Sequence, residues 1–109
     1  TMTQRESYAA ALGQDWADGL DALPEHMIGG VVRYVLHGVP AGNFLAAVIR
    51  GDLFGALRKA DDINKNMLPA YANFFWNHAP SICFGSEQAY DDWVKAGGVM
   101  GLRTKEDAE

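Results

Sequence analysis

The chain has 109 residues, of which 49% are hydrophobic and 11% aromatic, and its net charge is −5. This composition supplies one hydrophobic core of ordinary size and excludes a chain that is disordered throughout. No apolar run approaches the ~20 residues of a membrane span, and no signal-peptide pattern is visible. Because the single cysteine, Cys83, cannot form a disulfide within the chain, we expect a cytoplasmic protein.

The charge is distributed unevenly along the sequence. Residues 1–30 and 85–109 carry more acidic than basic side chains, whereas residues 31–84 carry a small basic excess. An acidic protein is a poor candidate for binding nucleic acid through its whole surface, although the sequence leaves room for a local basic face. We therefore expect a protein partner rather than nucleic acid or a membrane.

Helical spacing of the apolar residues, interrupted by Gly, Pro and Asp, predicts an all-α fold, a compact bundle of five or six short helices. The first helix is expected to begin after Thr3, which has the spacing of a capping box with Glu6. Its apolar residues continue at intervals of three or four to about Leu20, and Gly13 weakens it.

The second helix is expected to follow Pro24, which suits a first helical turn because its missing N–H would be unpaired there. It should end at His37 and Gly38, since glycine readily adopts the left-handed conformation that closes a helix. The pair Gly29-Gly30 within it has two explanations. Either a neighbouring helix crosses closely there, or the helix begins only near Gly30.

The remaining helices are short, and their expected ranges are about 43–50, 53–60, 63–77 and 87–96. Their caps are Asp52, either Asp61 or Asp62, and Ser86. Pro69 predicts a kink or a fresh start within the third of these ranges. We thus expect one helical domain over residues 3–102 and a mobile charged tail over residues 103–109.

No motif in the sequence predicts catalysis, a cofactor or a metal site. His78 and Cys83 lie five residues apart in an expected loop and could meet as base and nucleophile, but no motif supplies a third, orienting group. We therefore interpret Cys83 as a packed residue and expect no enzyme. His26 and His37 would be roughly 16 Å apart on one helix, too far for one metal ion.

An acidic row is the first candidate for partner binding. Asp15, Asp18, Asp21 and Glu25 recur every three or four residues, so on one continuous helix they would share an arc of roughly 120°. Such a row of carboxylates can imitate nucleic-acid phosphates in a basic channel of a partner. The alternative is a solvated helix face without a function.

Basic and aromatic residues of the central helices form the second candidate, comprising Arg50, Arg58, Lys65 and Trp76. The aromatics are too many to be all buried in a domain of this size, and Phe74, Phe75 and Trp76 point to successive faces of one helix. At least one is therefore expected to face outward, into a partner or a second copy in a homo-oligomer.

The chain also resembles small proteins carried by tailed phages and prophages of proteobacteria. The resemblance covers roughly residues 24–98 and rests on this series: Arg33-Tyr34, Gly38, Pro40, Gly42-x-Phe44-Leu45, Ala47-Val48, Asp52-Leu53, Ala60-Asp61, Asn64, Leu68, Phe74, Asn77-x-Ala79-Pro80, Cys83-x-Gly85-Ser86, Trp93 and Gly97-Gly98. Ala41 stands where the pattern has a second proline, and Phe84 where it has tryptophan.

This resemblance implies a phage accessory protein, and such small acidic helical proteins often inhibit host systems. The sharpest expectation is a type I anti-CRISPR protein, an inhibitor that binds a CRISPR effector of the bacterial host, for which the acidic row offers mimicry of nucleic acid as one mode of binding. The alternative is a small helical interaction module, or a regulatory module that binds nucleic acid through the basic and aromatic residues. Fold-level analogy alone does not decide between them.

Overall fold

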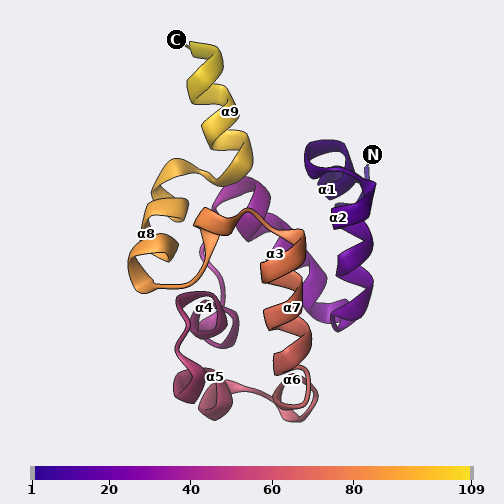
Figure 1. Cartoon of the computed structure of the whole chain (residues 1–109), viewed down its shortest axis with the longest axis vertical. Coiled ribbons are helices and arrows are strands. Elements are labelled where there is room, and N and C mark those ends of the chain that lie inside the picture. Colours follow the sequence, from indigo (N-terminus) through magenta and orange to yellow (C-terminus); the bar gives the residue numbers. More distant parts are fainter. Residues whose placement is uncertain (1, 109) are drawn as a thin grey trace.

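The computed structural model describes residues 2–108, with side chains described through Thr104. This part of the chain is helical and contains no strand, which confirms the all-α class (Figure 1). Its elements are α1 (Gln4–Leu12), α2 (Gln14–Asp18), η1 (Gly19–Ala22), α3 (Glu25–His37), α4 (Asn43–Arg50), α5 (Leu53–Lys59), α6 (Asp62–Lys65), α7 (Leu68–His78), η2 (Ser81–Cys83), α8 (Glu87–Ala96) and α9 (Gly98–Ala108). The described residues thus form nine α-helices rather than five or six, because two expected helices are split and a further one follows α8.

The first expected helix begins as predicted but ends early. The Thr3 hydroxyl accepts a hydrogen bond from the Glu6 N–H, and the Glu6 carboxylate accepts one from the Thr3 N–H, each at 3.1 Å. The helix ends at Leu12 because Gly13 has a φ of 100°, far outside the helical region. A continuous helix to Leu20 is therefore wrong, and the chain continues as α2 and η1 instead.

Helix α3 includes both central glycines, so the expectation of a late start near Gly30 is wrong. The atoms nearest to Gly29 belong to side chains, because a Cβ there would meet the side-chain amide of Gln4 at 2.7 Å. A Cβ on Gly30 would make only an ordinary contact with Leu45. The glycines accommodate neighbouring side chains, and Gly38, with a φ of 66°, ends the helix as predicted.

The capping predictions for the central helices are confirmed. Asp52 accepts a hydrogen bond from the Gly55 N–H at 2.9 Å, and Asp61 accepts one from the Asn64 N–H at 2.7 Å. Ser86 likewise caps α8. The range expected as one helix over 63–77 is divided into α6 and α7, with Pro69 in the first turn of α7. Pro69 thus marks the fresh start that the sequence allowed.

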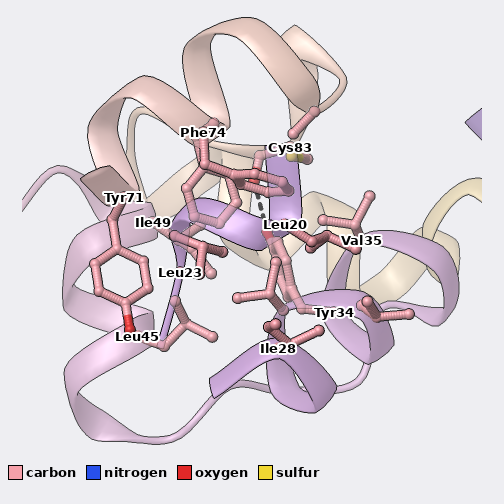
Figure 2. Close-up of a cluster of buried hydrophobic side chains, with 14 of the residues drawn as sticks. Leu20, Leu23, Ile28, Tyr34, Val35, Leu45, Ile49, Tyr71, Phe74 and Cys83 are labelled. Carbon is pink, nitrogen blue, oxygen red and sulfur yellow. Dashed lines mark hydrogen bonds between the residues drawn. The ribbon is translucent and has the colours of Figure 1, made fainter. Parts of the chain in front are cut away.

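The core draws on helices from both halves of the chain, as the labelled side chains in Figure 2 show. Its aromatic residues keep their polar atoms paired. The Tyr34 hydroxyl donates to the Cys83 carbonyl at 2.6 Å, and the Trp93 indole N–H donates to the Tyr34 carbonyl at 3.0 Å. The Tyr71 hydroxyl donates to the Asn64 side chain at 2.8 Å. These bonds offset the cost of burying the polar groups.

Two glycines bring the end of α3 against the turn between α8 and α9. Gly38 and Gly98 have φ values of 66° and 69°. A Cβ on Gly98 would lie 2.6 Å from the backbone nitrogens of His37 and Gly38, and a Cβ on Gly38 would lie 2.8 Å from the Gly98 nitrogen. Only glycines permit this approach of one backbone to the other.

The tail expected over residues 103–109 is helical in its described part, since α9 continues to Ala108, and Glu109 lies outside the described residues. The glycine contact redirects the chain after α8, so that a new helix starts where an end was expected. Arg103 donates a hydrogen bond to the Ala11 carbonyl of α1. Figure 1 shows α9 extending from the body at the end opposite α5 and α6.

Candidate interaction surface

An apolar groove of about 290 Å³ lies between α4, α5, α7 and the loop after η2. Its lining residues are Ala47, Val48, Gly51, Asp52, Leu53, Ala56, Leu68, Ala72, Phe75, Trp76, Phe84 and Gly85. The one charged side chain among them, Asp52, already caps α5. The groove therefore offers shape and apolar surface, and no set of groups suited to acid–base or nucleophilic chemistry.

Large apolar side chains stand exposed beside this groove. Trp76 and Phe54 are each 77% exposed, and Leu53 is 57% exposed. We call the exposed side chains of Leu53, Phe54 and Leu57 the α5 face, and Leu53 joins this face to the groove. Trp76 packs edge-on against Phe84, with ring centroids 6.5 Å apart. Exposed apolar residues gathered in this way mark interaction sites on soluble proteins.

The prediction that an aromatic residue faces outward is confirmed for Trp76. Four other large aromatic residues of the second half of the chain are buried, namely Tyr71, Phe74, Phe75 and Trp93. The α5 face was not predicted from the sequence. It could have been, because the seven-residue helix α5 has apolar side chains on more than one side, so that some of them must remain exposed to solvent.

The predicted basic residues differ in their surroundings. The Arg50 guanidinium lies 4.5 Å from the centre of the Tyr90 ring and makes a cation–π contact within the chain. Arg58 is exposed on α5, and Lys65 is exposed on α6. Arg58 is thus the one of the three that shares a helix with the α5 face.

The acidic row lacks the continuous helix on which its prediction depended. Asp15 and Asp18 lie on α2, whereas Asp21 belongs to η1 and Glu25 to α3. All four are exposed, but Arg5 pairs with Asp21 at 3.0 Å and with Glu25 at 2.7 Å. Hydrogen bonding to Arg5 also holds the pKa of Glu25 below its ordinary value. The sequence did not predict this pairing, because Arg5 is sixteen and twenty residues away.

Cys83 is fully buried, and its surroundings disfavour a nucleophile. Burial raises the pKa of its thiol to about 12, so the reactive thiolate is scarce at neutral pH. The His78 ring stacks on the Phe74 ring, and the backbone carbonyl of His78 accepts a hydrogen bond from the Tyr8 hydroxyl. His26 lies 3.7 Å from the Asp61 carboxylate. Within the described residues, no three His, Cys, Asp or Glu side chains are grouped to hold a metal ion.

Over the described residues, the helices are too short or too polar for any of them to traverse a bilayer. Comparison of the chain with protein-family models, with curated proteins and with solved structures found no match.

Proposed function

We propose that this protein is a non-catalytic binding protein that receives a protein partner on the α5 face and in the adjoining groove. The observation that carries the proposal is the 77% exposed Trp76 ring, which lines an apolar groove of about 290 Å³ together with Leu53 of the α5 face. Phe54, the next residue of that face, is equally exposed. Aromatic side chains that insert between apolar walls contribute a large share of the binding energy in protein interfaces.

The biological setting that we propose is the cytoplasm of a bacterial host, where the protein would act as a phage or prophage inhibitor of a CRISPR effector. The resemblance to phage proteins supports this setting. Exposed Asp15 and Asp18 on α2 supply the carboxylates for mimicry of nucleic acid, whereas Asp21 and Glu25 already share Arg5. Two carboxylates, rather than the four expected from the sequence, are therefore proposed to contact the partner.

The experiment is a binding titration of purified type I CRISPR effector complex against the immobilised protein. We expect Trp76→Ala to weaken binding at least tenfold, because it removes the exposed ring beside the groove. Val39→Ser is the matched control, since Val39 is exposed in the loop before α4 and does not line the groove. The double variant Asp15→Lys with Asp18→Lys tests the carboxylates.

The outcomes separate the parts of the proposal. Equal binding by Trp76→Ala and the control would refute the groove as the docking site, and no binding by the parent chain would refute the effector as partner. A DNA duplex is the second probe, because exposed Arg58 and Lys65 are the cations of the alternative regulatory module. Duplex binding that falls steeply with salt and is lost in Arg58→Gln would favour that alternative.

A further inference from the structure

We propose that a second copy of this chain occupies the α5 face, so that two copies pair about a two-fold axis. This inference goes beyond the proposed function, because it gives the same surface a second occupant, and a pair of copies must separate before another protein docks there. In a two-fold interface the same patch is used twice, so a face must be complementary to itself. The exposed apolar area and the helix geometry both meet this requirement.

The exposed apolar area matches what a stable dimer needs. At 77% exposure, Phe54 and Trp76 each present ~150 Å² of aromatic surface. The two exposed leucines of α5 bring the apolar area to roughly 450 Å² per copy. A standard interface buries ~800 Å² per partner, of which about 60% is apolar. The α5 face and Trp76 together therefore supply nearly all the apolar surface that such an interface contains.

The positions on α5 suit an antiparallel pairing of the two helices. Phe54 and Leu57 project to neighbouring sides of α5 and flank the point between Gly55 and Ala56. An antiparallel two-fold arrangement therefore sets Phe54 of one copy against Leu57 of the other, and does so twice. Antiparallel helices also oppose their dipoles favourably.

The same symmetry places the flanking residues consistently. On α5, Leu53 and the groove lie on one side of Phe54 and Leu57, and Arg58 lies on the other side. A two-fold axis perpendicular to both helices places the same side of each copy at the same side of the pair. The two grooves therefore adjoin, and the two Trp76 rings approach the same edge of the interface. The Arg58 side chains stay at the opposite rim, where water screens them.

The test is sedimentation velocity of the purified chain over a concentration range from ~1 to ~300 μM, because a dimer populates with concentration. We expect the mass to rise from 11.9 kDa toward twice that value. Phe54→Glu is expected to stay monomeric throughout, whereas Val39→Glu, the matched control in an exposed loop, is expected to pair like the parent chain. Circular dichroism verifies that each variant is folded.

A second measurement follows the Trp76 ring itself. The tryptophan emission of the chain is expected to shift to shorter wavelength as concentration rises, and Phe54→Glu abolishes the shift. Trp76→Phe is expected to abolish it as well, which assigns the shift to this ring rather than to Trp16 or Trp93. A parent chain that stays monomeric, or a dimer that Phe54→Glu leaves intact, overturns the inference. If the chain is monomeric but Trp76→Ala still weakens effector binding, this inference fails and the proposed function stands. If neither association nor effector binding depends on Phe54 or Trp76, both fail.

Discussion

The close approach of two backbones at Gly98 gives the sharpest prediction, the effect of Gly98→Ala. A Cβ at this position would lie 2.6 Å from the backbone nitrogens of His37 and Gly38, and the residue has a φ of 69°. The substitution therefore adds two costs, namely a left-handed conformation for alanine and a clash with atoms that cannot rotate away. Both costs fall on the junction that holds α8 and α9 against α3.

The magnitude follows from these two costs. A left-handed conformation costs a non-glycine residue ~1–2 kcal/mol, and forcing extra atoms into a packed site costs ~1–3 kcal/mol. We therefore expect the free energy of unfolding to fall by about 2–5 kcal/mol, a large part of the ~5–15 kcal/mol of an ordinary domain. The melting temperature is expected to fall by roughly 10 °C or more.

The matched control is Gly97→Ala. Gly97 has a φ of 80°, but a Cβ there would meet its nearest neighbour, the Gly101 Cα, at 3.3 Å. This control carries the conformational cost with little of the clash, so it should lose only ~1–2 kcal/mol. Urea unfolding followed by circular dichroism measures both variants. A Gly98→Ala loss no greater than that of Gly97→Ala would show that this backbone approach is not as close as the structure has it.

Three further predictions concern buried polar groups and the ion pairs of Arg5. Tyr34→Phe leaves the Cys83 carbonyl without its 2.6 Å hydrogen bond and should cost ~1–3 kcal/mol in urea unfolding; an unchanged midpoint would contradict this. Burial raises the pKa of Cys83 from 9.0 to about 12, so the folded state keeps a proton that the unfolded state loses. Stability should therefore fall as pH rises through this window, and iodoacetamide should label Cys83 only after unfolding; rapid labelling of the native chain would refute its burial. Arg5→Gln should raise the pKa of Glu25 toward its ordinary value in an NMR titration, and an unmoved titration would argue against the pairing.

The sequence by itself determined the helical class and most of the local boundaries. Thr3, Asp52 and Ser86 were identifiable as caps because a cap depends on residues only three positions away. Gly38 was identifiable as an end for the same reason. Such signals act within one turn of helix, so they are readable without knowledge of the fold.

The sequence failed where a boundary or a surface depended on distant residues. The start of α9 was missed because Gly98 is positioned against the end of α3, about sixty residues earlier in the chain. The acidic row does not lie on one continuous helix, because the chain changes from α2 to η1 and turns at Pro24 before α3, and Arg5 pairs with Asp21 and Glu25. A local pattern does not contain these contacts.

Only the tertiary structure decided which apolar residues remain in water. Phe54 and Trp76 do not differ in hydrophobicity from their buried neighbours, yet each is 77% exposed beside the groove. Their exposure follows from how α4, α5 and α7 pack, because that packing leaves one side of α5 and one edge of α7 uncovered. The sequence therefore specified the helices, whereas the candidate interaction surface arises from the way they are assembled.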